Sequence, residues 1–344
     1  MSRATKVTGA ALVPFAIAGI LFGIIYNALF YPHTLIEYVE ASTIGLILGL
    51  VTGILELSYL RHRFDKQPFV IGLIFRTSLY AVFVAVSLCL VLSIEPASLK
   101  ECLYFRCVIQ HFGDPLFIRD LFFSTVFVFF ATFSAQVVML IGTRNFRRLL
   151  VGQYRQPREI YAVFMFADIR SSTTIAEKLG HELFSAFLRD FFNDVADAIY
   201  HANGEIYQYV GDEVVIVWPG DTEKNRTSWL ACYQGMVQDL KDKSHVYRKK
   251  YGLIPVFKAG VHSGLVVVTE VGTLQKAHVY HGDVLNTASR IQSKCNEFGF
   301  NLLVSEQLAS KLSKTSTNDF QKVGAVHLRG KSETVVVYGF DKTS

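Results

Sequence analysis

Apolar residues are concentrated in the first 150 residues of the chain. Four stretches there are nearly free of charge, with Glu56 alone in the second and Arg76 alone in the third. The stretches are Ala10–Tyr31, Ala41–Leu60, Pro68–Ser93 and Leu121–Thr143. Each is close to the length of about 20 apolar residues that a helix needs to cross a membrane. The pattern therefore predicts four transmembrane helices within residues 1–143.

Cationic residues border the four stretches on one side. They are Arg3 and Lys6 before the first stretch, Arg61, Arg63 and Lys66 between the second and third, and Arg144, Arg147 and Arg148 after the fourth. The connection after the first stretch contains Glu37 and Glu40 but no Lys or Arg. Positive charge favours the cytoplasmic side, so we expect a multi-pass protein of the plasma (inner) membrane. Everything after residue 150 is then expected in the cytoplasm.

From Ile160 onward the pattern is that of a soluble α/β domain. A buried strand, "IYAVFMFADI", precedes an amphipathic helix, "HELFSAFLRDFFNDVADAIYHA", and a hairpin, a second long helix and further strands follow. The basic segment 144–158 joins the two parts, and we expect it to continue the fourth helix to about Pro157. The predicted organisation is a membrane domain over 1–143, a linker or transducing helix over 144–158, and a soluble domain over 159–344.

The net charge of +5 does not indicate nucleic-acid binding. The first 150 residues contain 12 Lys and Arg against 8 Asp and Glu, whereas the rest contains 22 against 21. The excess therefore belongs to the membrane half, where topology explains it. The five cysteines lack zinc-site spacing, and Cys102 and Cys107 either pair in an oxidising compartment or remain free thiols.

Two aspartates mark the candidate chemistry of the soluble domain. Asp168 ends the first strand in "FADIRSST", and Asp212 lies at the tip of the hairpin "EIYQYVGDEVVIVW". If these strands are neighbours, the two carboxylates converge at one point. Such a pair suits Mg²⁺, which takes its remaining ligands from water and substrate phosphates. A single strand-end Asp more often caps a turn, but two in apolar sequence favour a metal site.

Three further sets of polar residues are weaker signals when taken singly. Thr174 and Glu177 have capping-box spacing, and a helix start at that point can hold a phosphate. Asn286 and Arg290 are four residues apart on a predicted helix and so share one face, which suits developing phosphate charge or simply faces solvent. Arg329 and Lys331 lie in the turn sequence "LRGK".

Taken together and in this order, four motifs resemble the class III nucleotidyl cyclase catalytic domain. They are "FADIRSSTTIAEKLG", "YVGDEVVIVWP", "GDVLNTASRIQ" and "LRGKSETVVVYGF", and the similarity covers roughly residues 158–341. The resemblance implies an α+β, ferredoxin-like cyclase domain that follows an all-α membrane domain of four helices. It also implies a head-to-tail homodimer with active sites at its interface.

The resemblance assigns a role to each candidate residue. Asp168, Asp212 and the Ile169 carbonyl match the ligands of two Mg²⁺ or Mn²⁺ ions. Asn286 and Arg290 match the pair that the partner subunit supplies to orient the ribose and stabilise the transition state, and Arg329 matches the basic residue that faces the triphosphate. The implied reaction is attack of the ribose 3′-oxygen on the α-phosphorus, with pyrophosphate leaving.

The positions that read the purine depart from the family pattern. Adenylate-forming members usually carry Lys and then Asp or Thr where this chain has Gln208 and Val279, and guanylate-forming members typically carry Glu and Cys. The Gln208 amide both donates and accepts hydrogen bonds, so it suits either adenine or guanine. We expect ATP as the substrate because most bacterial-looking cyclases of this kind resemble adenylate-forming members. The alternatives are a guanylate cyclase and a catalytically silent cyclase-like membrane receptor.

The two charges within the predicted membrane helices also leave two interpretations open. Glu56 and Arg76 lie several residues inside the cytoplasmic boundary on consecutive helices. Ionisable residues buried in a membrane are costly and are often functional, so the two side chains either pair inside the bundle or extend to the nearby interface.

Overall fold

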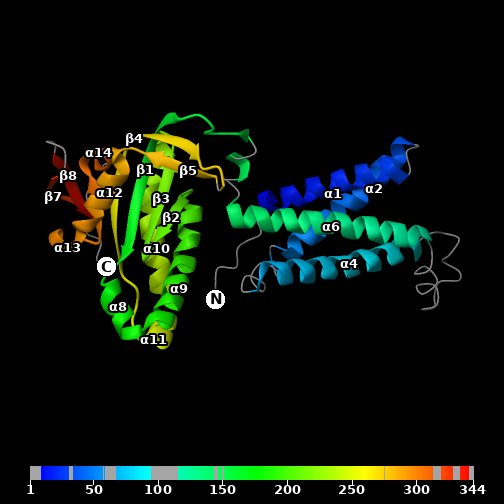
Figure 1. Cartoon of the computed structure of the whole chain (residues 1–344), viewed down its shortest axis with the longest axis horizontal. Helices are drawn as coiled ribbons and strands as arrows, with labels where there is room; N and C mark the ends of the chain where they lie inside the picture. The colour runs from blue at the N-terminus through cyan, green and yellow to red at the C-terminus, as the bar shows by residue number, and fades with distance from the viewer. Residues whose placement is uncertain are drawn as a thin grey trace. The chain divides into compact units, whose positions relative to one another are not determined.

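The protein forms two compact units, Met1–Val151 and Gly152–Ser344 (Figure 1). A computed structural model describes residues 9–30, 34–56, 58, 67–93, 115–142, 146–148, 151–274, 276–312, 319–327 and 334–340. Arg329, Lys331, Cys102 and Cys107, all singled out in the sequence, lie outside the described residues.

Among its described residues, the first unit contains four helices that are long and apolar enough to cross a membrane, which confirms the predicted number. They are α1 (Gly9–Phe30), α2 (Leu35–Leu55), α4 (Phe69–Ser93) and α6 (Pro115–Ile141). Two predicted boundaries are wrong. Helix α2 begins six residues before Ala41, because Thr34 and Glu37 form a capping box at its start. Helix α6 begins at Pro115, so its first turns include Arg119 and Asp120, which form an ion pair.

The buried residues of the membrane unit include glycines and polar residues, and many of its apolar side chains face outward. Leu29, Ile36 and Phe122 are at least 60% exposed, as expected where lipid replaces water. Helices α1 and α2 pack through glycines, and a Cβ atom on Gly45 would overlap the backbone oxygen of Gly19. Small residues at a helix interface allow two backbones to approach closely within a membrane.

The fourth helix does not continue unbroken to Pro157, so that prediction is wrong. Helix α6 ends at Ile141, and Gly142 follows with φ +86°, a left-handed conformation that glycine adopts without strain. The described part of the linker resumes helical geometry at Phe146–Arg148, where the Phe146 N–H donates to the Gly142 carbonyl. The connection between the units therefore contains a turn directly after the membrane helix.

The second unit is built on a mixed sheet with the strand order β2-β3-β1-β4-β6-β8-β7, in which β5 pairs with β4. The strands are β1 (Arg158–Ile169), β2 (Glu205–Val210), β3 (Glu213–Pro219), β4 (Phe257–Val271), β5 (Ala277–His281), β6 (Leu302–Ser305), β7 (Phe320–His327) and β8 (Thr334–Phe340). The helices are α8 (Ser172–Leu179), α9 (His181–His201), α10 (Glu223–Asp242), α11 (Ser244–Tyr251), α12 (Asp283–Ser293), α13 (Cys295–Phe298) and α14 (Glu306–Ala309). The β4–β6 pair is parallel, and the other pairs are antiparallel.

Strand β1 is buried on both faces because helices cover both sides of the sheet (Figure 1). Alternate residues such as Val163 and Met165 join the core beneath α9 and α10, including Phe187 and Trp229. Their neighbours, such as Phe164, pack instead on the α12 side. This alternation follows from the period of two in a strand. It also places Asp168, four residues after Phe164, on the α12 face of the sheet.

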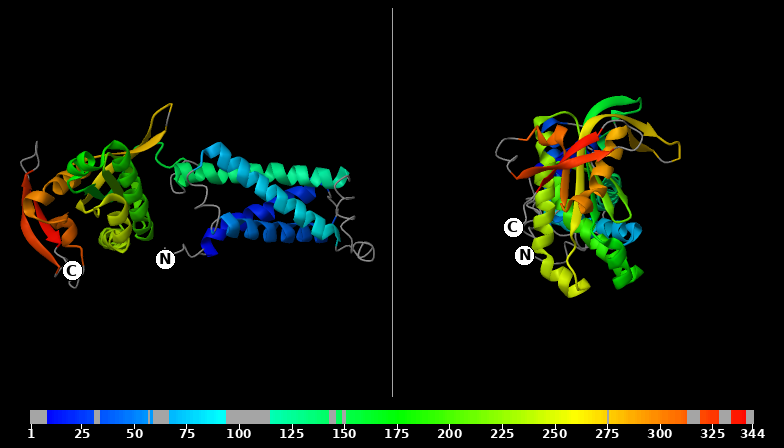
Figure 2. Two further views of the ribbon diagram at one scale, coloured as in Figure 1. Left: turned by 90° about the horizontal axis from the view of Figure 1, so that it is seen from below. Right: turned by 90° about the vertical axis from the view of Figure 1, so that its left-hand side faces the viewer.

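Figure 2 shows the same unit from two further directions, with β7 and β8 in red. These two strands form the end of the sheet opposite to β2. At the β2 end of the sheet, β3 pairs with β1, so the β2–β3 hairpin lies next to the end of β1. These two features position the candidate site described next.

Candidate active site

Asp168 is the penultimate residue of β1 and lies between two charged neighbours in the sheet. It is directly opposite Glu213 of β3 on one side and Lys258 of β4 on the other. Lys258 Nζ lies 3.2 Å from Asp168 Oδ2 and forms a largely buried ion pair with it. Two carboxylates and one ammonium group thus meet at the end of three adjacent strands.

Asp212 follows Gly211 in the two-residue turn between β2 and β3. Gly211 has φ +62°, the conformation that the first position of a tight hairpin turn requires and that glycine supplies readily. Because β3 is the neighbour of β1, the turn brings Asp212 beside Asp168. The two carboxylates therefore converge as predicted, because β1 and β3 are neighbours in the sheet.

The acids at this edge disfavour one another's ionised forms. Burial, and then the adjoining Asp212 carboxyl group and its charge, raise the pKa of Asp168 to about 6, although Lys258 opposes the shift. Burial and the charges of Asp168 and Asp212 likewise raise the pKa of Glu213 to about 7. Excess negative charge held in a partly buried place is a property of cation-binding sites.

The geometry fits a divalent cation at Asp168 and Asp212. Asp212 Oδ2 is buried and has no hydrogen-bond partner among the described residues, so it retains a lone pair for a cation. The described residues contain no group of three or more His, Cys, Asp or Glu side chains suited to a metal ion. Two carboxylates, with the Ile169 carbonyl close by at the end of β1, suit Mg²⁺ or Mn²⁺ whose other ligands are water and phosphate oxygens.

Two side chains at the carboxylate pair were missed in the sequence. Lys258 is the second residue of β4, and its proximity to Asp168 depends on the long-range pairing of β1 with β4. Gln292 of α12 donates a hydrogen bond of 3.0 Å from Nε2 to Asp168 Oδ2. The available signal for Gln292 was an amide on the mostly apolar face of a helix that includes Val284, Ala288 and Ile291.

Helix α12 lies directly on the sheet and carries Asn286 and Arg290. A Cβ atom on Gly260 of β4 would overlap the Gln292 backbone nitrogen, so only glycine permits this close approach. Asn286 is exposed and Arg290 is partly buried, and neither belongs to the fully buried face of the helix. The spacing of four residues therefore places both on one side of α12, as predicted.

The two predicted base-reading positions lie on different strands. Gln208 is exposed on β2, beyond a bulge between Ile206 and Gln208, and it pairs with Val215. Val279 lies on β5 and pairs with Thr269. The residues next to them, Tyr207 and Tyr280, make an edge-to-face ring contact with centroids 5.2 Å apart. The contact joins β2 to β5 across the α12 face of the sheet.

The helix that follows Asp168 starts differently from the prediction. Helix α8 begins at Ser172, so Thr174 lies inside the first turn and does not act as the predicted cap. The cap position is Ser171, which has φ 57° and no side-chain capping bond. The N–H groups of the first turn thus lack the side-chain acceptor that a capping box would supply.

A family model for the adenylate and guanylate cyclase catalytic domain matches residues 155–340, more than half of the chain. The chain belongs to this family. Asp168, Asp212, Asn286 and Arg290, whose positions are described above, all lie within the matched cyclase region.

The curated relatives of this cyclase chain bear related names. Adenylate cyclase 2 of Rhizobium meliloti (strain 1021) is 30% identical over 205 residues, which cover 60% of this chain and 56% of that protein. An adenylate cyclase of Anabaena cylindrica is 27% identical over 177 residues, 51% of this chain and 35% of that protein. The chain thus spans about half or less of the length of these relatives.

Solved structures show the same fold. A bacterial light-regulated adenylyl cyclase is similar with a TM-score of 0.54 at 20% identity, over 63% of this chain and 64% of that one. This likeness confirms the cyclase-type α+β fold predicted for the second unit.

Proposed function

We propose that the protein is a membrane-bound nucleotidyl cyclase that converts ATP into 3′,5′-cyclic AMP and pyrophosphate in signal transduction. The main support is the pair Asp168, at the end of β1, and Asp212, in the turn before the neighbouring strand β3, because one Asp212 oxygen has no hydrogen-bond partner among the described residues. Family membership supports the type of reaction. The names of the two bacterial relatives favour ATP over GTP.

The metal half of the proposed site consists of Asp168, Asp212 and the Ile169 carbonyl. When bound there, two Mg²⁺ or Mn²⁺ ions would make the ribose 3′-hydroxyl easier to deprotonate and would offset triphosphate charge. The chain contributes the fixed orientation of the carboxylates, since Gln292 and Lys258 hold Asp168 Oδ2 in place. The uncapped start of α8 provides backbone N–H groups close to Asp168 for a phosphate.

The second half of the proposed site is Asn286 and Arg290 on α12 of a partner subunit. Arg290 provides fixed positive charge for the phosphorus centre, where negative charge develops during attack. Asn286 orients the ribose through its amide. Each chain has both halves, so a head-to-tail homodimer contains two complete sites. Arg329 completes the proposal as a triphosphate contact, although it lies outside the described residues.

The proposed reader of the base is Gln208, with Val279 beside the purine. Gln208 donates to adenine N1 and accepts from the 6-amino group, or in the flipped orientation it suits guanine. Its exposed position on β2, four residues before Asp212, places it near the end of the sheet that carries the acids. GTP is the second candidate substrate because the Gln208 amide suits guanine as well as adenine.

The proposed location is the plasma (inner) membrane, spanned by four helices in contact with the lipid bilayer, with the cyclase domain in the cytoplasm. The positive residues that flank the spans support this orientation. No nucleic acid is needed as a partner.

The test is product identification with the full-length protein in membranes, Mn²⁺, and either ATP or GTP. Cyclic AMP from ATP supports the proposal, and Asp212→Asn is the inactive control. Cyclic GMP from GTP as the main product would replace ATP with GTP as the proposed substrate. If neither cyclic nucleotide forms, the chain is a silent cyclase-like receptor.

A further inference from the structure

A buried polar cluster lies inside the membrane unit. Arg76 of α4 forms an ion pair with Glu56, which closes α2, with Nη1 and Oε1 3.2 Å apart. The Tyr80 hydroxyl donates to Glu56 Oε2 at 2.8 Å. All three residues are at most 8% exposed. The two membrane charges thus pair inside the bundle, which decides between the two interpretations left open by the sequence.

Two hydrogen-bond donors near this cluster have no acceptor. Arg76 Nε and Gln136 Nε2 are both buried and lack a partner among the described residues. Gln136 lies on α6, one turn from Thr132, whose hydroxyl is 3.4 Å from that of Thr77 on α4. Arg76 adjoins Thr77, and Gln136 faces Gly72, one turn from Arg76 on α4, so the two donors lie on neighbouring turns of the α4–α6 contact. An unmet donor within a membrane is costly, because lipid tails offer no hydrogen bonds.

There is space beside the Gln136 amide, on the side of its oxygen. Gly72 is buried on α4, one turn from Arg76, yet a Cβ atom built on it would meet only Gln136 Oε1, at 3.9 Å, within 4 Å among the described residues. The glycines of α1 and α2 show the opposite, since Cβ atoms there would overlap backbone. Gly72 therefore leaves room next to Gln136 that no described side chain fills.

The chemistry of the unmet groups defines what fits there. Both are N–H donors, and both Glu56 oxygens are already engaged by Arg76 and Tyr80. The Arg76 charge is balanced by Glu56, so an anionic ligand would bring an uncompensated charge into the bundle. A water molecule would introduce two O–H groups, and Gln136 Oε1, the acceptor beside the space, can take only one of them. An uncharged acceptor on an apolar chain meets neither difficulty.

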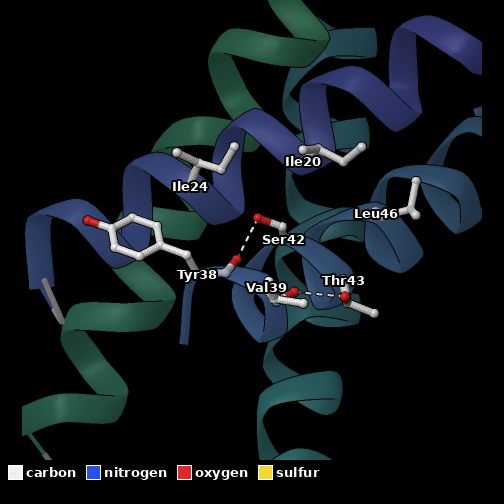
Figure 3. A pocket seen from close by; sticks show the side chains of 7 residues that line it. All are labelled: Ile20, Ile24, Tyr38, Val39, Ser42, Thr43 and Leu46. Atoms are coloured by element: carbon white, nitrogen blue, oxygen red, sulfur yellow. Dashed lines mark hydrogen bonds between the residues drawn. The ribbon is translucent and has the colours of Figure 1, made fainter. Parts of the chain in front are cut away.

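We propose that the membrane unit binds the carbonyl group of an uncharged lipophile between α4 and α6, where Arg76 and Gln136 donate to its oxygen. The site is distinct from the shallow groove of ≈ 380 Å³ that runs between α1 and α2 (Figure 3). The Ser42 and Thr43 hydroxyls of that groove both donate to carbonyls of their own helix, as its dashed lines show. They therefore provide no donor for a ligand.

The test follows a labelled carbonyl directly. Full-length protein in detergent is mixed with 2-tridecanone carrying ¹³C at its carbonyl, and a carbonyl resonance shifted by hydrogen bonding is sought by NMR. The wild type should give this bound resonance, and Gln136→Leu should weaken binding about tenfold, as expected for one buried hydrogen bond. Gly72→Leu should abolish it by filling the space while both donors remain.

Matched controls make the result decisive. Ser124→Ala removes another buried polar group of α6, three turns away, and should leave the bound resonance unchanged. Gln136→Leu also removes an unmet polar group, so the variant should fold at least as well as the wild type. A phosphatidylcholine labelled at its ester carbonyls, in a second arm, distinguishes a bilayer lipid from a free lipophile as the source. The absence of a bound resonance in both arms, or an equal one in Gln136→Leu, overturns the proposal.

Discussion

Gln292 Nε2 donates a hydrogen bond of 3.0 Å to Asp168 Oδ2, and this contact joins helix α12 to the carboxylate pair at the end of the sheet. Lys258 contacts the same oxygen, at 3.2 Å. The Lys258 ammonium group and the Gln292 amide therefore contact the same oxygen of Asp168, and these contacts orient its carboxylate. The same helix carries Asn286 and Arg290, so α12 connects the two halves of the proposed site within each chain.

Replacing Gln292 with Met should weaken metal binding about tenfold, because residues that orient a metal ligand commonly affect affinity by that factor or more. The measurement is the Mn²⁺ concentration that gives half-maximal cyclic nucleotide production by the full-length protein. Ser293→Ala, an exposed neighbour on the same helix, is the matched control and should leave this midpoint unchanged. An unaltered midpoint in Gln292→Met would show that the contact does not position Asp168.

The stability of the metal-free cyclase domain should fall as pH rises from about 4 to 7. Burial, and then Asp212, raise the pKa of Asp168 from its usual value of 3.8 to about 6. Burial, and then Asp168, raise the pKa of Glu213 from its usual value of 4.5 to about 7. The folded state therefore holds protons that the unfolded state has released in this window, and stability is lost as they dissociate.

Mn²⁺ should reverse this loss, so the rise in melting temperature on adding Mn²⁺ should be larger at pH 7.5 than at pH 5.5. Tryptophan fluorescence isolates the relevant transition, because the two tryptophans of the chain, Trp218 and Trp229, are both buried in the second unit. Asp168→Asn should stabilise the metal-free domain at pH 7.5 and abolish the Mn²⁺ response. Equal Mn²⁺ shifts at both pH values would contradict the assignment.

Gly45→Ala should destabilise the membrane unit by about 1–3 kcal/mol, the usual cost of overpacking. The new Cβ atom would overlap the Gly19 backbone and force α1 and α2 apart. Gly72→Ala is the matched control, since its Cβ meets no atom closer than 3.9 Å among the described residues. The readout is the temperature at which detergent-solubilised protein loses its monodisperse gel-filtration peak. Equal effects of the two substitutions would refute the packing argument.

Substitutions at Gln208 should shift purine selectivity in opposite directions. Gln208→Lys keeps only donors, which suit adenine N1, whereas Gln208→Glu keeps only acceptors, which suit guanine N1–H. The ratio of kcat/KM for ATP to that for GTP should change about tenfold or more in each direction. Gln321→Glu, an exposed substitution on β7, is the control for the added charge. If neither Gln208 variant changes the ratio, another residue reads the base.

The sequence was informative wherever a pattern was local. Asp168 and Asp212 were identifiable because each ends or interrupts an apolar strand, and the fold then makes those strands neighbours. Lys258 was not identifiable, because its contact depends on the pairing of β1 with β4 across about 90 residues. Gln292 could be placed beside Asp168 only if the rotation of α12 relative to the sheet were known. Close packing on Gly260 determines this rotation, and the hydropathy pattern does not reveal it.

Helix ends were predicted less well, for a related reason. A hydropathy pattern excludes polar residues from a membrane helix, yet Thr34 and Glu37 begin α2 by capping it. The linker was predicted as continuous helix because its composition allows one, whereas Gly142 introduces a turn. Caps and turns depend on single residues, so they are not visible in average composition.

Two copies of this chain are proposed to complete each other's active sites, and complementation tests this arrangement most directly. Full-length Asp212→Asn and Arg290→Ala should each be inactive. When the two are co-expressed, random pairing gives mixed dimers with one intact site, so roughly a quarter of the wild-type rate of cyclic nucleotide production should return. No recovered activity in dimers shown to contain both variants would contradict the shared site.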